Sequence, residues 1–363
     1  MAAPQAEPLP PELARYHRQI MLPAIGIAGQ RRLLAARVML IGCGALGTAL
    51  ANTLVRAGVG KLTLVDRDFI EPNNLQRQSL FDEDDIAASL PKAIAAQGKL
   101  ARINSAVQID AVVSDVNYSN IEALLARAGG ADLILDGTDN FETRFLINDL
   151  SIKSAVPWIY GAVLGTTGLA MVIRPGLTPC LRCVFETIPP PGMNPTCDVA
   201  GILAPAVAIV AGWQSAEALK LLTGQPTSPY LFSFDLGDNR FQQVNIASAR
   251  STADCPVCQH REFDFLHGKF GSASTTLCGR DAVQILPRTA HAEPLDFSCI
   301  AANLHAVASA TYNAYMLRCV ISDASASAEK TYEMTLFPDG RAIIKGTSDP
   351  ALARTLYAKY IGA

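Results

Sequence analysis

The chain has 363 residues, of which 50% are hydrophobic and 17% are charged; this composition excludes a largely disordered protein and allows a sizeable core. Thirty basic residues against 33 acidic residues give a net charge of −3, so the overall charge does not favour binding to nucleic acid or to an anionic membrane. No stretch near the N-terminus resembles a secretion signal, and glycine and proline interrupt the longest uncharged apolar run, residues 199–216. We therefore expect a cytoplasmic protein of two or more domains, without a membrane span.

The first part of the chain alternates predicted strands with predicted helices. Residues 12–35 are expected to form two short helical pieces that separate near Pro23 and Gly26. Strands are then expected at residues 37–41, 61–65, 107–112 and 132–136, with helices at about 45–57 and 91–103 and another before the last strand. Because a strand, a helix and a second parallel strand make one βαβ unit, this order predicts a parallel, doubly wound α/β sheet.

After about residue 156 the pattern changes to shorter β-rich segments. A helix is expected at residues 207–222, followed by paired strands at 230–235 and 241–246. Beyond about Gly268 the sequence predicts a helix near 297–309, strands near 315–321 and 332–337, a hairpin turn at Asp339-Gly340, and a last helix from Pro350. We therefore expect an N-terminal helical segment of residues 1–35, a Rossmann-like domain of residues 36–267 and a small α+β domain of residues 268–363.

A glycine-rich turn joins the first predicted strand to its helix. Gly42, Gly44 and Gly47 stand in the pattern G-x-G-x-x-G, with Ala45 after the second glycine. Glycines at this spacing let the backbone approach a phosphate, which the N-terminus of the helix then faces. Asp66 ends the next strand, where a carboxylate can bind ribose hydroxyl groups. The alternatives are a nicotinamide or flavin enzyme, and a glycine turn that only packs a helix on the sheet.

Polar residues beyond this turn suit ATP and Mg²⁺ better than hydride transfer. Asn74 and Arg77 follow the ribose carboxylate, and Lys92 begins a helix where its ammonium group can meet a phosphate. Asp139 and Asn140 come just after a buried strand, at the edge where doubly wound sheets bind ligands, and the Asp139 carboxylate could hold Mg²⁺. Singly, each of these residues has a plainer explanation as a solvated cation or a helix cap. No histidine lies in the predicted nucleotide core to serve as a base for hydride chemistry.

Four of the nine cysteines form two C-x-x-C pairs, Cys180 with Cys183 and Cys255 with Cys258. In a chain expected to be cytoplasmic, two such pairs indicate a structural zinc site of four thiolates more strongly than a redox site. Cys197 stands apart from both pairs, in the sequence T-C-D-V-A-G. The remaining cysteines lie in apolar surroundings and are expected in the core; they are Cys43, Cys278, Cys299 and Cys319.

Several motifs together resemble those of the ThiF/MoeB/HesA family, the bacterial relatives of the ubiquitin-activating enzymes. The resemblance rests on R-Y-H-R-Q-I at 15–20, on G-C-G-A-L-G, L-x-L-V-D-R-D, N-N-L-Q-R-Q, L-P-K-A and G-T-D-N-F-E-T-R, and on both C-x-x-C pairs. It covers about residues 12–262 in unbroken order. It implies ATP-dependent adenylation of the C-terminal Gly-Gly of a ubiquitin-like sulfur carrier protein, which prepares the carrier for conversion to a thiocarboxylate. One departure is minor: Ala45 stands where the molybdopterin branch commonly has glycine.

The resemblance also implies roles for individual residues. The implied nucleotide ligands are Asp66 for the ribose, Asn74, Arg77 and Lys92 for the triphosphate, and Asp139 for Mg²⁺. Arg18 is implied to reach the γ-phosphate of ATP in a neighbouring subunit, which requires a homodimer; the alternative is an exposed helix cation. Cys197 matches a position that some members use for a covalent link to a carrier or sulfur donor, and its alternative is an inert loop thiol.

The C-terminal stretch points to one branch of the family. The segments L-C-G-R-D-A-V-Q-I at 277–285, F-P-D-G-R-A-I-I-K-G-T at 337–347 and A-x-x-L-Y-x-K-Y at 353–360 resemble the extension of thiazole-biosynthesis adenylyltransferases. We therefore expect the carrier of thiamine (thiazole) biosynthesis as the partner, with the molybdopterin-synthase carrier as the alternative. A cysteine desulfurase or a rhodanese-like protein is the expected sulfur donor. Two other classes remain, a Rossmann oxidoreductase and a non-catalytic scaffold that binds a ubiquitin-like protein.

Overall fold

The structure is a computed structural model that describes residues 9–186, 200–252, 254–270, 274–277, 281–285, 295–304, 308–323 and 330–362. These residues form two compact units, one of the described residues up to 186 and of 202–270, and the other mainly of those after Phe270, together with Ala200 and Gly201. The first unit carries the glycine-rich turn and both C-x-x-C pairs, and the second consists mainly of the small C-terminal part of the chain.

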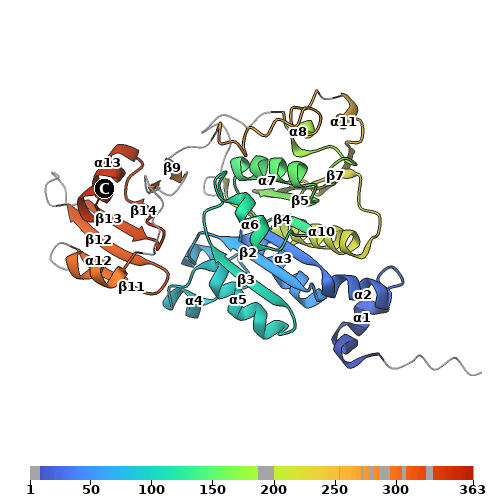
Figure 1. Cartoon of the computed structure of the whole chain (residues 1–363), viewed down its shortest axis with the longest axis horizontal. Helices are drawn as coiled ribbons and strands as arrows, with labels where there is room; N and C mark the ends of the chain where they lie inside the picture. Colours follow the sequence, from blue (N-terminus) through green and yellow to red (C-terminus); the bar gives the residue numbers. More distant parts are fainter. Residues whose placement is uncertain are drawn as a thin grey trace, which may run out of the picture. The chain divides into compact units, whose positions relative to one another are not determined.

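An eight-stranded sheet forms the centre of the first unit (Figure 1). Its strands are β1 (Arg37–Ile41), β2 (Lys61–Asp66), β3 (Gln108–Val113), β4 (Leu133–Asp136), β5 (Trp158–Leu164), β6 (Thr167–Ile173), β7 (Tyr230–Asp235) and β8 (Arg240–Asn245). They lie in the order β3-β2-β1-β4-β5-β6-β7-β8. Strands β3, β2, β1, β4 and β5 are parallel, and β6 to β8 continue the sheet in antiparallel pairs. The doubly wound α/β fold predicted from the sequence is therefore confirmed.

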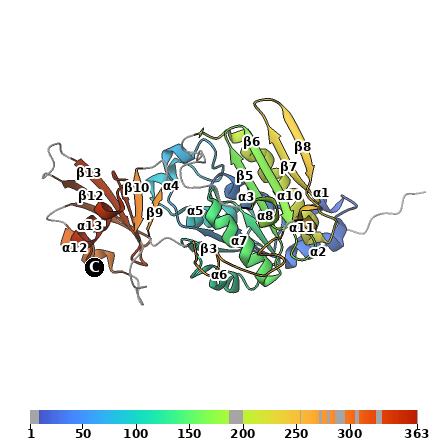
Figure 2. The same ribbon diagram turned by 90° about the horizontal axis from the view of Figure 1, so that it is seen from above.

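Helices cover both faces of this sheet, as Figure 2 shows. The longer ones are α2 (Gly26–Ala35), α3 (Ala45–Ala57), α5 (Lys92–Ile103), α6 (Ile121–Arg127), α7 (Phe141–Ser154) and α10 (Ala204–Thr223). Alternate residues of β1 point to opposite faces: Val38 and Leu40 pack with α3, α5 and α10, whereas Met39 and Ile41 pack with α6 and α7. Burial on both sides explains why the central strands β1 and β4 are nearly continuous apolar runs in the sequence.

Short helices complete the first unit; they are η1 (Pro11–Tyr16), α1 (His17–Ile20), η2 (Pro72–Asn74), α4 (Glu83–Ala87), α8 (Leu181–Val184) and α11 (Ala249–Thr252). The N-terminal helical pieces predicted before β1 are η1 with α1, and α2. The buried Tyr16 hydroxyl accepts a 2.8 Å hydrogen bond from Asn104, which ties this segment to the end of α5. Among the described residues, no helix is both long and apolar enough to span a bilayer.

The described residues after Phe270 form a six-stranded antiparallel sheet with two helices packed against it. Its strands are β9 (Ser274–Leu277), β10 (Ala282–Ile285), β11 (Ser309–Tyr312), β12 (Leu317–Asp323), β13 (Lys330–Leu336) and β14 (Ala342–Lys345), in the order β11-β12-β13-β14-β10-β9. Helices α12 (Phe297–Leu304) and α13 (Pro350–Tyr360) pack against strand residues such as Leu317, Cys319 and Met334. The α+β composition predicted for this part of the chain is confirmed.

Two finer predictions in this unit are wrong. The helix expected at 297–309 ends at Leu304, and Ser309 begins strand β11. Cys299 is exposed rather than buried, because it lies two residues after the buried Phe297 and thus about 200° around the helix from it. Cys43 and Cys319 are buried as predicted, and Cys278 lies outside the described residues.

Candidate functional site

The turn between β1 and α3 packs tightly against the end of β4. Gly42 has a φ of +89°, and a Cβ atom there would lie 2.6 Å from the carbonyl carbon of Gly137. A Cβ atom on Gly47 would lie only 2.0 Å from the carbonyl oxygen of Gly42. These two glycines therefore serve the packing of helix on sheet, since neither position has room for a side chain.

Gly44 differs from its neighbours because the space beside it is open. The nearest atom to a Cβ built on Gly44 is Nε2 of the buried Gln78, at 4.0 Å. Gly44 is the N-cap of α3, and no described side chain caps this helix, so its first N–H groups remain available to an anion. Ala45 is the first helical residue, so the departure from glycine at this position causes no strain. The arrangement fits a phosphate-binding turn.

Asp66 lies at the end of β2 and supports this turn from the neighbouring strand. Its Oδ2 accepts a 2.6 Å hydrogen bond from the backbone N–H of Cys43, and its Oδ1 accepts one of 2.7 Å from the N–H of Asp68. Burial raises the pKa of the Asp66 carboxyl group, against the opposing effect of the Lys92 ammonium group. Each carboxylate oxygen has a second lone pair, so acceptor capacity remains for the hydroxyl groups of a ribose.

Asn74 and Arg77 follow β2 in the loop that contains η2. Asn74 is buried, and its Oδ1 accepts a 3.1 Å hydrogen bond from the N–H of Glu71 while its Nδ2 donates to Asn73 Oδ1 at 2.8 Å. Arg77 is half-buried and donates from Nη1 to the carbonyl oxygen of Asn73 at 2.8 Å. The Asn74 amide thus shapes the loop, whereas the Arg77 guanidinium has further N–H donors for a phosphate.

Lys92 is buried at the start of α5, and its Nζ lies 3.1 Å from Asp68 Oδ2. Arg67 lies beside the same carboxylate, 3.6 Å from Asp68 Oδ1 and 2.7 Å from Asp115. An ammonium group has three N–H donors, so the ion pair with Asp68 leaves Lys92 able to donate to a phosphate oxygen as well. The sequence motifs alone do not identify Asp68 as a partner of Lys92. Its position two residues after Asp66 is the feature of the sequence that could indicate this.

Asp139 and Asn140 lie in the loop between β4 and α7. Asn140, rather than Asp139, caps the helix: its Oδ1 accepts a 2.8 Å hydrogen bond from the N–H of Glu142. Asp139 is exposed, and its charge acts on the nearby Arg67 and Arg144. Mg²⁺ in nucleotide sites is commonly held by one or two carboxylates together with substrate phosphates and waters, so an exposed carboxylate here fits that ion.

Arg18 and Cys197 stand outside this group of residues. Arg18 is exposed on the short helix α1, where its guanidinium is available to a second chain. Cys197 lies outside the described residues, so its covalent role stays a prediction.

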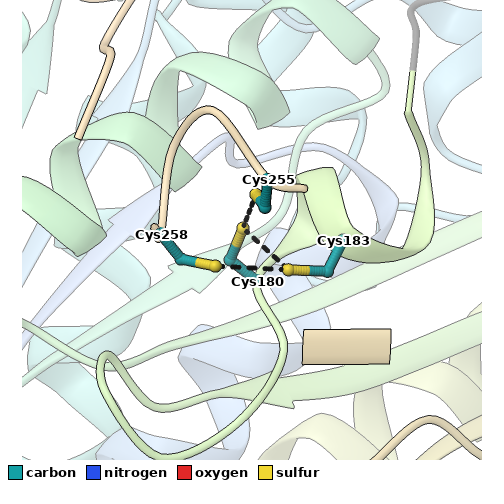
Figure 3. Close-up of side chains that lie close together, drawn as sticks. All are labelled: Cys180, Cys183, Cys255 and Cys258. Atoms are coloured by element: carbon teal, nitrogen blue, oxygen red, sulfur yellow. Dashed lines mark hydrogen bonds between the residues drawn. The ribbon is translucent and has the colours of Figure 1, made fainter. Parts of the chain in front are cut away.

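The two C-x-x-C pairs meet in space, as Figure 3 shows. All four sulfur atoms lie within 4.8 Å of one another, with Cys180 3.6 Å from Cys255 and Cys183 3.3 Å from Cys258. Four sulfurs held tetrahedrally at about 2.3 Å from a zinc ion lie roughly 3.8 Å apart, so the cluster fits a closed Cys₄ zinc site.

Helix α7 holds the backbone beside both cysteine pairs. Oδ1 of the buried Asn148 accepts a 2.8 Å hydrogen bond from the N–H of Leu181, the first residue of α8. Oδ2 of the buried Asp149 accepts hydrogen bonds from the N–H groups of Phe265, at 3.0 Å, and Leu266, at 3.3 Å. Burial raises the pKa of the Asp149 carboxyl group to about 7, although both hydrogen bonds favour the ionised form.

Comparison with known proteins adds four findings. The model of the ThiF family matches residues 16–257. The sulfur carrier protein ThiS adenylyltransferase of Bacillus subtilis is 44% identical over 349 residues, which cover 96% of this chain and 99% of that protein. The adenylyltransferase and sulfurtransferase MOCS3 of Sus scrofa is 35% identical over 284 residues, covering 75% of this chain and 61% of that protein. The crystal structure of E. coli MccB with ATP has the same fold, with a TM-score of 0.56 at 22% identity over 69% of this chain and 76% of that chain.

Proposed function

Because this chain belongs to the ThiF family, we propose that it is an adenylyltransferase that activates the C-terminal carboxylate of a ubiquitin-like sulfur carrier protein with ATP. The extent of one match carries the proposal: the ThiS adenylyltransferase of B. subtilis aligns over 96% of this chain, which includes the small C-terminal unit. The substrate we propose is accordingly the carrier of thiamine (thiazole) biosynthesis.

The residues around the glycine-rich turn supply what this reaction needs. The N–H groups at the start of α3 would bind phosphate oxygens, Asp66 would accept hydrogen bonds from the ribose, and Arg77 and Lys92 would neutralise the triphosphate. The carrier carboxylate then attacks the α-phosphorus of ATP and forms a new oxygen–phosphorus bond. The bond between the α-phosphorus and the oxygen that bridges to the β-phosphate breaks, and pyrophosphate leaves with its electrons. Such a step depends on positioning and on charge stabilisation rather than on an enzyme nucleophile. Mg²⁺ held by Asp139 would supply further neutralisation of phosphate charge.

Other parts of the proposal concern assembly and sulfur supply. The Cys₄ cluster would hold one structural zinc ion per chain. The motif that contains Arg18 implies a homodimer in which each nucleotide site receives this side chain from the neighbouring subunit, and its exposure leaves it accessible for that role. The adenylated carrier would receive sulfur from a persulfide donor such as a cysteine desulfurase or a rhodanese-like protein, in the cytoplasm.

Carrier-dependent exchange of labelled pyrophosphate into ATP tests the activity. The purified chain is assayed with a thiazole-type carrier, with a molybdopterin-type carrier, and with a thiazole-type carrier that lacks its last glycine as the control. Exchange with the first carrier alone is expected. Equal or greater exchange with the molybdopterin-type carrier would move the substrate to the alternative, and no exchange with either carrier would refute the adenylation function.

A further inference from the structure

A buried arginine, Arg144, contacts the loop that carries Asp139. Arg144, on the first turns of α7, is 5% exposed, and its Nε donates to Oδ2 of the fully buried Asp136 at 3.0 Å. Its Nη2 donates to two carbonyl oxygens, that of Thr138 at 2.7 Å and that of Gly161 at 3.0 Å. The planar guanidinium fork therefore joins the end of β4, the loop after it and strand β5.

These contacts fix Thr138, the residue immediately before Asp139. The backbone carbonyl of Thr138 accepts from Arg144, while its N–H and its hydroxyl both donate to Asp136 Oδ1, at 2.9 and 2.7 Å. Both backbone groups of this residue are thus held by the same ion pair. Asp139 itself is exposed, so its position depends on the residues on either side of it.

The opposite side of Asp139 is held by the Asn140 cap at the start of α7, the helix that also carries Arg144. The Arg144 guanidinium also lies over two aromatic rings, 5.6 Å from the centroid of Phe141 and 5.4 Å from that of Tyr160. A lysine could neutralise Asp136, but a single ammonium group cannot reproduce the coplanar fork that reaches the carboxylate and both carbonyls.

We propose that Arg144 is a positioning residue for the adenylation reaction, which holds the Asp139 carboxylate where the metal–nucleotide complex needs it. The inference rests on the proposed function and assigns a task to a side chain that does not itself touch the nucleotide. Its alternative is a purely structural ion pair that supports the fold and nothing more.

Arg144→Lys tests this inference, with Gln214→Met as the matched control. Gln214 is equally buried and donates to the carbonyl oxygens of Asp136 and Ile159, so its loss also weakens the packing of β4 on β5. It makes no hydrogen bond to Thr138 among the described residues. Both variants should lose thermal stability, but only Arg144→Lys should raise the Mg²⁺ concentration for half-maximal exchange. We expect a rise of about 10-fold or more, with a kcat about 10- to 100-fold lower.

Two further measurements separate positioning from structure. In an Asp139→Asn background, Arg144→Lys should cost much less activity than in the wild-type chain, because it acts through a carboxylate that is no longer there. Calorimetric titration of Mn²⁺ into the protein with a non-hydrolysable ATP analogue should show weaker metal binding in Arg144→Lys than in Gln214→Met, without any turnover.

The outcomes are distinct. Unchanged metal binding in Arg144→Lys, or activity losses that add fully in the Asp139→Asn background, would overturn the positioning role. If Arg144→Lys binds Mn²⁺ more weakly, and the wild-type chain binds the nucleotide but adenylates no carrier, the positioning role is supported and the proposed reaction is refuted. A wild-type chain that binds no nucleotide would overturn both.

Discussion

Helix α7 contributes to two polar centres that differ in how their charges are balanced. At its start, the buried charges of Arg144 and Asp136 neutralise each other within the protein, and Lys92 and Asp68 do the same nearby. One turn further along α7, Asn148 contacts the backbone of Leu181, between Cys180 and Cys183 of the four-cysteine cluster, whose thiolates would need an external cation. The first centre is therefore complete before any ligand arrives, whereas the second would be completed only by a bound metal ion.

Removal of the metal is the sharpest way to test this difference. Cys183→Ser should lose zinc and reduce the free energy of unfolding by more than about 4 kcal/mol, because the ion joins two segments far apart in the chain. Metal analysis and denaturant unfolding measure both effects. Cys299→Ser, which alters an exposed thiol on α12, is the control and should keep its zinc. A full zinc complement in Cys183→Ser would refute the ligand set.

The pH dependence of stability tests the Asp149 contacts. The pKa of Asp149 is raised from 3.8 to about 7 by burial, so its contribution to stability is complete below about pH 4 and is lost as the pH rises to about 7. Relative to Asp149→Asn, the wild-type free energy of unfolding should fall by about 2 to 4 kcal/mol across that window. Thermal or urea unfolding at several pH values measures the difference.

Asp110→Asn is the control for this pH series. The Arg127 guanidinium lowers the pKa of Asp110, so the stability that this carboxylate contributes is present above pH 4 and is lost only at lower pH. Between pH 4 and pH 7 the free energy of unfolding of Asp110→Asn should therefore change with pH as that of the wild type does. Identical slopes for wild type and Asp149→Asn would show that Asp149 is not protonated in the folded chain.

At the nucleotide centre, substitution should affect activity more than metal content. Asp66→Ala should reduce carrier-dependent exchange about 10- to 150-fold, since losing a charge-assisted contact to the ribose costs roughly 1.5 to 3 kcal/mol. Asp66→Asn keeps one oxygen for the N–H of Cys43 or Asp68 and serves as the structural control. Both variants should retain one zinc per chain. Normal exchange by Asp66→Ala would remove this residue from the site.

The smallest expected signal concerns the proposed homodimer. Chains with Arg18→Ala and chains with Asp139→Ala should each be inactive, yet a mixed dimer contains one intact site. Equal mixing with full subunit exchange should restore about a quarter of the wild-type sites, which the exchange assay can detect. Absence of recovery, with mixed dimers verified by mass spectrometry, would place Arg18 in its own chain's site or outside any site.

The sequence predicts the features that depend on short motifs. The glycine turn, the carboxylate at the end of β2 and the four cysteines are each defined by a few neighbouring residues and a fixed spacing, so they can be identified without a structure. Strands buried on both faces are likewise visible as short apolar runs bounded by turns.

Features that depend on tertiary packing are not predictable in this way. The division of tasks among Gly42, Gly44 and Gly47 depends on the approach of Gly137, which is distant in sequence. The pairing of Lys92 with Asp68 likewise requires α5 to begin beside the end of β2. In the second unit, the apolar pattern alone does not show which side of α12 faces the sheet. The prediction of a buried Cys299 is wrong for that reason, since the side chain is exposed.

The contact between Gly42 and Gly137 limits how this enzyme can evolve or be engineered. A side chain at either position meets the backbone of the other within 2.6 Å, and neither backbone can move without displacing the strand that carries it. A substitution at Gly42 or Gly137 therefore clashes with backbone, and a second substitution at the other glycine cannot relieve the clash. Single amino-acid changes at these two positions should all destabilise the loop. Gly44 is the exception, because a methyl group fits there in the ligand-free chain. A side chain at Gly44 would instead occupy the open space beside the N-terminus of α3, so this position is restricted by the phosphate it would bind and not by the fold.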